Sequence, residues 1–546
     1  LGEYDPRVAL VIDPVLTWNT FLGGGGYEVG YGIAVDASAN VYVTGFSEGG
    51  WGTPVHDFSG SEDAFVAKLD SNGALIWNTF LGSYYYDAGF AIAVDASGNS
   101  YVSGASGDWG TPVRPYTDGG DAFAAKLDSN GNLTWNTFLG GSYSDFGTGI
   151  AVDENGNVYV GGDSWETWGN PVRSFTENPD PNGISIDAFA VKLDPNGALV
   201  WNTFLGSVEA DRGYGIAVDA SENVYVAGGS NTSWGALECT GCPIRAFSDL
   251  GDAFAAKLAS NGVLTWNTFL GGSLPDGAKG IAVDSNGRVH VAGFSFGTWG
   301  APVRAHTGTD DIFAANLESN GTLIWNTFLG GKGWEGGGEI AVSGGNVYVS
   351  GYGNSTWGKP RRPFTNDADV FAAKLNASGA LTWNTFLGGG GWDGGGGNTA
   401  TGRRRDVPIA VDTSGNSYIT GFSRIAWGKP VRAHAGLWDV FVAKIPSTPD
   451  CAQKPEIPYL LKPFNTIKVK GPDVILDWAN TACAKTYEVV VKRDSKNGPV
   501  AFEMRGLKKS KTVAKSLALG HTYFWRITAV NEFGKSNSVW FRFKVK

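Results

Sequence analysis

The chain has 546 residues and a formal net charge of −11, with 17% charged residues, five histidines and one methionine. So few histidines leave little material for acid–base catalysis, and the acidic balance argues against nucleic acid as a partner. No run of the sequence reaches the roughly 18–20 apolar residues that a membrane helix needs, so no transmembrane segment is expected.

A hexapeptide, WNTFLG, dominates the chain after residues 1–14, which are expected to form a lead segment. It occurs seven times, at spacings of 59, 58, 66, 65, 59 and 58 residues, opening at Trp18, Trp77, Trp135, Trp201, Trp266, Trp325 and Trp383. Self-similarity at this period is typical of the four-stranded blades of a β-propeller.

The first period shows four short runs rich in β-branched and aromatic residues, at Gly32–Asp36, Val41–Gly45, Asp63–Leu69 and Leu75–Leu81. Tight turns at Asp36–Asn40 and Asp70–Gly73 supply the Asn and Gly that close hairpins. Each period is therefore predicted to be an antiparallel meander of four strands.

The strand count predicts how the ring closes. Seven periods share the GIAVD-like run, but the last ends at Asp439–Ile445 and no WNTFLG follows it. The surplus copy at Trp18 is therefore expected to become the outermost strand of the seventh blade, which removes two open sheet edges. The predicted fold is all-β, a seven-bladed propeller over residues 15–446.

The recurring pattern GIAVDxxGNVYVTG, followed by DAFVAKLDxNGxLxWxTFLGG, resembles the SBBP-type β-propeller repeat of bacteria and archaea over about Val15 to Ile445. The resemblance implies a secreted or surface-anchored protein, often with a further domain ahead of the propeller. The stretch Tyr4–Leu16 resembles the junction after such a domain, which suggests the trimmed product of a longer precursor.

Composition changes near residue 446. A proline-bearing linker at residues 447–458 precedes a Lys-rich segment, residues 459–546, that resembles a fibronectin type III β-sandwich. The resemblance makes Trp478 the buried tryptophan of an early strand and Tyr523 the corner tyrosine.

The two halves carry opposite charge. Residues 451–546 contain 18 Lys and Arg against 7 Asp and Glu, a net of +11, which leaves 24 basic and 46 acidic residues in the remainder, a net of −22. Opposite charges orient docking, and a sandwich that meets the propeller of the next molecule builds an open fibre or layer. Packing within one chain, or simple solubility, is the alternative explanation.

Two sets of tryptophans recur with the repeat. The hexapeptide tryptophans follow a turn glycine by four residues, a spacing that resembles the docking motif of quinoprotein propellers, and we favour a structural role for them.

The second set precedes glycine in the loops between the second and third strands: Trp51, Trp109, Trp168, Trp234, Trp299, Trp357 and Trp427. Matching arginines follow most of these, at Arg114, Arg173, Arg245, Arg304, Arg361 and Arg432. Such pairs could stack sugars or grip anions, but we favour the alternative that they hold the loops.

Residues outside the repeat are the better candidates for binding. They are Tyr84, Tyr85, Tyr86, Trp334, Trp392, Arg403, Arg404 and Arg405. The arginines lie in the Gly-rich loop Gly388–Pro408, where they could contact an acidic neighbour, a phosphate or an acidic glycan, or simply be solvated.

An acidic residue recurs before each first strand. The set is Glu28, Asp87, Asp145, Asp211, Asp276, Glu335 and Asp393. It could form a ring that attracts a cation at the mouth of the channel, but capping of the backbone is favoured.

The four cysteines suit an oxidising compartment. A disulfide between Cys451 and Cys483 would clamp the linker, and Cys239 with Cys242 is expected to form a small loop disulfide, since one CxxC supplies only two zinc ligands.

No catalytic constellation can be assembled from the spacing, so the sequence predicts a protein that is not an enzyme and has no cofactor or metal. The leading hypothesis is an extracellular or cell-surface structural protein that self-assembles head-to-tail, basic sandwich against acidic propeller. The alternatives are a carbohydrate-binding adhesin that uses the Trp/Arg loop face, and a noncatalytic module of a secreted hydrolase.

Overall fold

The computed structural model describes residues 16–179, 185–235, 242–394, 406–447, 455, 457–463, 467–478, 481, 483–531 and 534–546. Within these ranges the regular structure is entirely β-strand, and no helix is long and apolar enough to cross a membrane. The chain divides into two compact units, one of Trp18–Gly358 with Phe364–Ile445 and one consisting chiefly of Pro446–Lys546.

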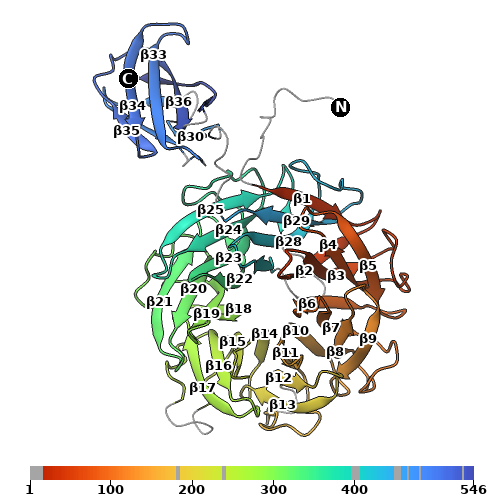
Figure 1. The fold of residues 1–546 in the computed structure, drawn as a ribbon. Helices are drawn as coiled ribbons and strands as arrows, with labels where there is room; N and C mark the ends of the chain where they lie inside the picture. The colour runs from red at the N-terminus through yellow and green to blue at the C-terminus, as the bar shows by residue number, and fades with distance from the viewer. Residues whose placement is uncertain are drawn as a thin grey trace. The chain divides into compact units, whose positions relative to one another are not determined.

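The first unit is a ring of sheets around a central axis (Figure 1). Its first blade consists of β2 (Glu28–Val35), β3 (Val41–Ser47), β4 (Asp63–Leu69) and β5 (Leu75–Leu81), each antiparallel to the next. The innermost strand starts four residues before the predicted run, because the register shifts between Gly30 and Gly32 and leaves Tyr31 in a bulge. A bulge bends its strand and re-aims a side chain, and here the bulged residues line the axis.

The next five blades repeat this meander. Their strands are β6 (Ala88–Val94), β7 (Ser100–Ser106), β8 (Asp121–Leu127) and β9 (Leu133–Leu139); β10 (Asp145–Val152), β11 (Val158–Ser164), β12 (Asp187–Leu193) and β13 (Leu199–Leu205); β14 (Asp211–Val218), β15 (Val224–Ser230), β16 (Asp252–Leu258) and β17 (Leu264–Leu270); β18 (Asp276–Val283), β19 (Val289–Ser295), β20 (Asp311–Leu317) and β21 (Leu323–Leu329); and β22 (Glu335–Ser343), β23 (Asn346–Gly353), β24 (Asp369–Leu375) and β25 (Leu381–Leu387).

The seventh blade joins both ends of the propeller sequence. It is built from β26 (Asp393–Gly394), β27 (Ile409–Val411), β28 (Ser417–Ser423) and β29 (Asp439–Ile445), and β1 (Trp18–Leu22) is its outermost strand. Strands β1 and β29 run antiparallel, with Trp18 opposite Lys444 and Leu22 opposite Val440. The predicted closure is confirmed.

The cores of the propeller lie between neighbouring blades. Between the first two blades, Trp77 packs with Tyr42, Ile92 and Phe123, all of them buried. The Trp77 indole N–H also donates to the carbonyl oxygen of Ser129, 3.1 Å away in the next blade. Docking on the adjacent blade, predicted for the hexapeptide tryptophans, is therefore confirmed.

The second unit is a sandwich of two sheets. One sheet contains β30 (Leu460–Lys462), β32 (Val474–Trp478) and β35 (Lys511–Ala514); the other contains β31 (Ile467–Val469), β33 (Thr486–Arg493), β34 (Val500–Leu507), β36 (Thr522–Asn531), β37 (Gly534–Asn537) and β38 (Phe541–Val545). Trp478 is fully buried, and the Tyr523 hydroxyl donates to the carbonyl of Ala518 at 3.1 Å. Both predicted features of a fibronectin type III-like sandwich are present.

Candidate functional site

One face of the propeller, here called the loop face, carries two kinds of loop. These are the loops between the second and third strands of each blade and the loops that enter each inner strand. The hexapeptide fixes these loops from within the blade. The Asn78 side-chain amide donates to the Trp51 carbonyl oxygen at 2.8 Å, and the Trp51 ring packs edge-on against Phe80, with centroids 5.9 Å apart. Trp51 is buried, so it contributes to the core and presents no surface for a ligand.

The loop arginines join each blade to the next. The Arg114 guanidinium donates to the carbonyl oxygens of Phe138 and Gly140, both at 2.9 Å, and lies 5.4 Å from the Trp168 ring of the following blade. The same arrangement recurs with Arg173 on Trp234, Arg245 on Trp299, Arg304 on Trp357 and Arg432 on Trp51. These Arg–Trp pairs therefore hold the loops, as predicted, and they do so across the boundary between blades, which was not predicted.

The recurring acidic residues lie inside the blade interfaces. Asp145 is fully buried; its carboxylate accepts the backbone N–H of Gly141 at 2.9 Å and the hydroxyl of Ser164. Burial, reinforced by the neighbouring Asp121 carboxylate, raises the pKa of Asp145 to about 8. The backbone-capping role is confirmed, and these carboxylates do not form an exposed ring at the mouth of the channel.

A second carboxylate accompanies each of these acids, which the sequence analysis did not single out. Asp121 is the first residue of β8, is fully buried, and accepts the backbone N–H of Thr117 at 2.9 Å. Its equivalents open the third strand of every blade, as Asp63, Asp187, Asp252, Asp311, Asp369 and Asp439. The signal was visible in the sequence, because an aspartate precedes every copy of the AFVAKL-like run.

Exposed tyrosines occupy the loop between β5 and β6. Tyr84 and Tyr85 are 79% and 70% exposed, and their rings lie 6.2 Å apart. Tyr86 is less exposed, at 37%, and its ring lies 6.5 Å from the ring of Phe46. Tyr143, in the corresponding loop of the next blade, is 63% exposed and was missed in the sequence, where it stands as a single tyrosine between Ser142 and Ser144.

The two predicted tryptophans lie together. The rings of Trp334 and Trp392 are 6.0 Å apart at an interplanar angle of 36°, and Trp334 also contacts Tyr352. In the neighbouring blade, Arg424 lies 4.9 Å from the ring of Trp438, which stacks on Phe422. The tryptophan group and the Tyr84–Tyr86 loop are separated around the ring by the β26–β29 blade and the β2–β5 blade.

The bulged inner-strand residues surround a cavity of about 130 Å³ on the axis. Tyr31, Phe90 and Thr148 line it from three blades. Lys279 lies 3.6 Å from the Tyr214 ring and 3.9 Å from a carboxylate oxygen of Asp406. The residue at the bulge position thus varies between blades, being aromatic at Tyr31, Phe90 and Tyr214 but Thr148 and Lys279 elsewhere, whereas the residues around it repeat.

Several predicted site residues fall beyond what the structure describes. Arg403, Arg404 and Arg405 lie outside the described residues, as do Cys239 and Cys451. Neither Cys242 nor Cys483 is a free thiol, and their pairing with Cys239 and Cys451 stays a prediction. Within the described ranges, no cluster of three or more His, Cys, Asp or Glu side chains could hold a metal ion.

Comparison with known proteins identifies the repeat. Residues 135–167, which run from within β9 through β10 and β11, match the family model of the SBBP β-propeller repeat. The propeller is thus built of SBBP-type repeats, and the second unit is a fibronectin type III-like sandwich. That sandwich is similar to the crystal structure of FN3tt, at 20% identity over 17% of this chain and 94% of that chain, with a TM-score of 0.13.

Curated relatives are distant. The chain is 25% identical over 409 residues to the regulatory protein FlaEY of Caulobacter vibrioides, covering 66% of this chain and 39% of that protein. It is 23% identical over 235 residues to an uncharacterized WD repeat-containing protein of Acanthamoeba polyphaga mimivirus, covering 37% of this chain and 17% of that protein. The chain therefore spans less than half the length of both relatives.

Proposed function

We propose that this protein is an extracellular, noncatalytic structural protein that assembles head-to-tail, with the basic sandwich of one molecule on the acidic propeller of the next. The observation that carries the proposal is the opposite charge of two separately compact units. Complementary charge steers and orients association, and a head-to-tail contact that does not close produces a fibre or a layer.

The turn face, which is formed by the hairpin turns of each blade, offers negative charge to such a partner. Asp128 is partly exposed in such a turn, and hydrogen bonds from the side chain and backbone of Asn132 lower its pKa. Asp95 and Asp219 occupy equivalent turns: partial burial opposes their charge, but hydrogen bonds from Asn99 and Asn223 outweigh it and lower their pKa values. These three turn carboxylates are therefore kept ionised, whereas carboxyl groups such as Asp145 inside the blade interfaces are pushed toward the neutral form.

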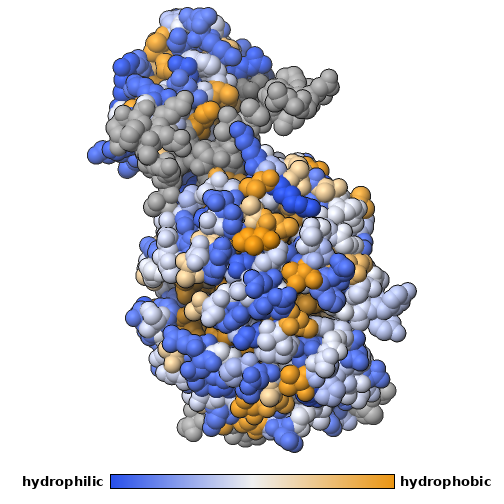
Figure 2. Space-filling model, turned by 45° about the vertical axis from the view of Figure 1, so that its right-hand side comes forward, coloured by the Kyte–Doolittle hydropathy of each residue, from blue (hydrophilic) through white to orange (hydrophobic). Residues whose placement is uncertain are grey.

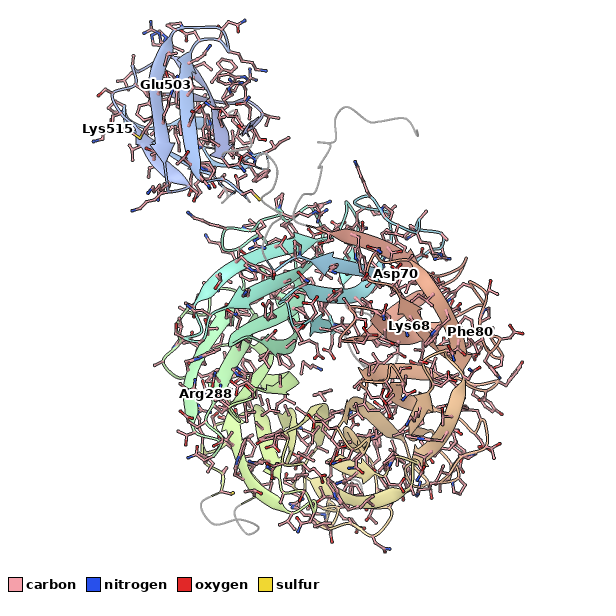
Figure 3. The ribbon with its side chains drawn as sticks, viewed as in Figure 1. Lys68, Asp70, Phe80, Arg288, Glu503 and Lys515 are labelled. Carbon is pink, nitrogen blue, oxygen red and sulfur yellow. The ribbon has the colours of Figure 1, made fainter. Side chains whose placement is uncertain are left out.

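The sandwich offers a matching basic surface. Lys508, Lys509, Lys511 and Lys515 follow the exposed strand β34 and are themselves exposed. Figure 3 labels Lys515 at the margin of the sandwich. Among the described residues, none of these four lysines forms an ion pair within the chain, so their charge remains available to a partner.

Light scattering coupled to size exclusion tests this proposal on the full chain. Oligomers are expected at low salt and should dissociate at 0.5 M salt, where charges are screened within about 5 Å. Reversal of Lys508, Lys509 and Lys511 to Glu should abolish them. The same reversal at Lys468 on β31, Lys470 just after it and Lys544 on β38 should have a smaller effect. A strict monomer at high concentration and low salt would rule out the proposal.

A second candidate function is carbohydrate binding at the loop face. It is favoured by the exposure of Tyr84, Tyr85 and Tyr143, three rings that the blade fold does not require. Figure 2 shows apolar residues as separate patches within a largely hydrophilic propeller surface, a pattern that fits local stacking sites better than one broad apolar interface.

A glycan array with the full chain tests the second candidate. Binding should be lost in Tyr84→Ala/Tyr85→Ala and kept in Ile76→Ala, another exposed apolar residue of the same blade. An array without any bound glycan would eliminate this candidate and leave the assembly proposal untouched.

A further inference from the structure

Among the described blade interfaces in which two buried carboxyl groups face one glycine, three also leave an oxygen of the third-strand residue without a hydrogen bond. The pairs are Asp121 with Asp145, Asp187 with Asp211, and Asp311 with Glu335, and all six side chains are fully buried. In each pair, one residue opens the third strand of a blade and the other opens the first strand of the following blade. The glycine between them ends the intervening WNTFLG copy, as Gly140, Gly206 or Gly330.

One oxygen of each pair lacks a hydrogen-bond partner. Asp145 is satisfied at both oxygens, by Gly141 and Ser164, and Asp121 accepts the Thr117 N–H at Oδ2. Oδ1 of Asp121 is buried with no hydrogen bond, and the same holds for Oδ1 of Asp187 and of Asp311. An unsatisfied, fully buried carboxylate oxygen is costly, so it must be explained chemically.

The unsatisfied oxygen faces the second carboxyl group. A Cβ placed on Gly140 would lie 2.8 Å from Oδ1 of Asp121 and 2.4 Å from Oδ2 of Asp145, so these two oxygens are within about 5 Å of each other. A Cβ placed on Gly206 or on Gly330 would likewise lie close to one oxygen from each carboxyl group of its own pair. Two negative charges this close and this deeply buried repel strongly.

The charged groups around Asp121 and Asp145 show how much of the negative charge of this pair is neutralised. The charged groups that act on Asp121 and Asp145 are Arg114, from the loop between β7 and β8, and Glu166, from the loop between β11 and β12. The Arg114 guanidinium offsets one of the two carboxylate charges and also occupies the Gly140 carbonyl oxygen. A metal cation would be repelled by this guanidinium and would find too few free carboxylate oxygens to bind it. A proton, in contrast, neutralises the remaining negative charge and gives Oδ1 of Asp121 a hydrogen bond.

We propose that each of these three carboxyl pairs holds one proton at neutral pH, as a hydrogen bond between a carboxylic acid and its partner carboxylate inside the blade interface. The proton belongs to the pair, because coupled groups titrate together. It comes from solvent when the ring folds, so folding at neutral pH takes up protons. The burial that raises the pKa values of Asp145, Asp187 and Glu335 to about 8 agrees with this assignment.

Infrared spectroscopy of the full chain with ¹³C-carboxyl-labelled aspartate tests the proposal directly. The native protein at pH 7 should show the carbonyl stretch of protonated aspartic acid, and the band should disappear on thermal unfolding at the same pH and on titration above pH ~9. A native protein without this band above pH 6 would overturn the proposal. Stoichiometric metal bound to the purified protein, measured by mass spectrometry of the native state, would overturn it as well.

Single substitutions test whether the infrared band of protonated aspartic acid comes from the carboxyl pairs. Asp121→Asn and Asp187→Asn, which replace a carboxyl by an amide of the same shape, should each remove the signal of one protonated carboxyl group. Asp118→Asn, an exposed aspartate of the same loop as Arg114, should leave the band unchanged. If the amide variants fail to fold, the pH titration of the unsubstituted protein still decides the question.

Discussion

At the scale of single residues, each position of WNTFLG has a separate structural task. The Trp donates to the turn of the next blade, the Asn holds the loop of its own blade, and the Phe packs against the loop tryptophan. The Phe and Gly carbonyl oxygens bind the loop arginine, as those of Phe138 and Gly140 bind Arg114. The hexapeptide recurs because the joint between blades recurs, which explains why the most conspicuous motif in the chain says little about a ligand.

Replacing Arg114 should weaken one joint. Arg114→Ala removes two charge-assisted hydrogen bonds and the contact with Trp168, so we expect the free energy of unfolding to fall by about 2 to 4 kcal/mol, measured by urea denaturation. Arg114→Lys should recover little of the loss, because an ammonium group cannot reproduce the planar fork. Arg288→Ala, on a turn of the β18–β21 blade, is the control, and an equal loss there would refute the role assigned to Arg114.

At the scale of the elements, the hairpin turn between the third and fourth strands is a docking surface for the preceding blade. Gly131 has a φ of +88°, and a Cβ on it would lie 2.8 Å from the ring of Trp77. Gly98, in the other hairpin of the same blade, has a similar φ of +78°, but a Cβ on it would meet nothing closer than 3.3 Å. The two glycines therefore share a backbone requirement and differ in the indole that covers one of them.

Alanine substitution at these two glycines separates backbone strain from docking. Gly131→Ala should destabilise the propeller more than Gly98→Ala, by about 1 to 3 kcal/mol, because only the first forces the indole of Trp77 away. Calorimetric unfolding of both variants measures the difference. Equal destabilisation would mean that the indole contact contributes nothing beyond the turn.

The seam between β1 and β29 is the second feature at this scale. Without β1, the strand β29 would become an exposed edge and the buried WNTFL surface of the last blade would be lost. Deletion through Leu22 should therefore give aggregating protein by size exclusion. A synthetic peptide that contains WNTFLG should restore a soluble species by adding the missing strand, while a scrambled peptide should not. Soluble, stable protein without β1 would contradict this role.

At the scale of the whole molecule, the propeller sorts its many acidic residues into two populations. In the blade interfaces, burial raises the pKa values of Asp145, Asp187 and Glu335 to about 8. Acidic residues in the turns, such as Asp128, have lowered pKa values because Asn and backbone N–H groups bind the charged form. The formal charge of the sequence therefore overstates the negative charge of the folded propeller.

This sorting predicts how stability depends on pH. Between the unfolded pKa of about 4 and the folded pKa of about 8, the folded ring binds more protons than the unfolded chain, so its stability falls as pH rises through this window. The turn carboxylates act in the opposite direction and lose their contribution only below pH ~4. We expect the melting temperature of the propeller, followed by scanning calorimetry, to drop by several degrees from pH 5 to pH 9. A melting temperature that rises over this range would contradict the inferred burial energetics.

The sequence by itself determined the number of blades, their strand order, the closure by β1 and the sandwich that follows. The features of the propeller depend on local patterns repeated seven times, so each of those predictions was supported by every copy, whereas the sandwich was indicated by the change in composition near residue 446 and by its own resemblance. The sequence also indicated Trp334 and Trp392 as candidate binding residues, and the structure places them in contact.

The paired carboxyl groups could not be predicted, because Asp121 and Asp145 belong to different blades and meet only when the sheets pack. Only the tertiary structure decided that Arg114 stacks on Trp168, that the first strands bulge toward the axis, and which acidic residues face solvent. Each of these features depends on contacts between neighbouring blades. The sequence of a single repeat does not show which of its side chains will lie against the next blade.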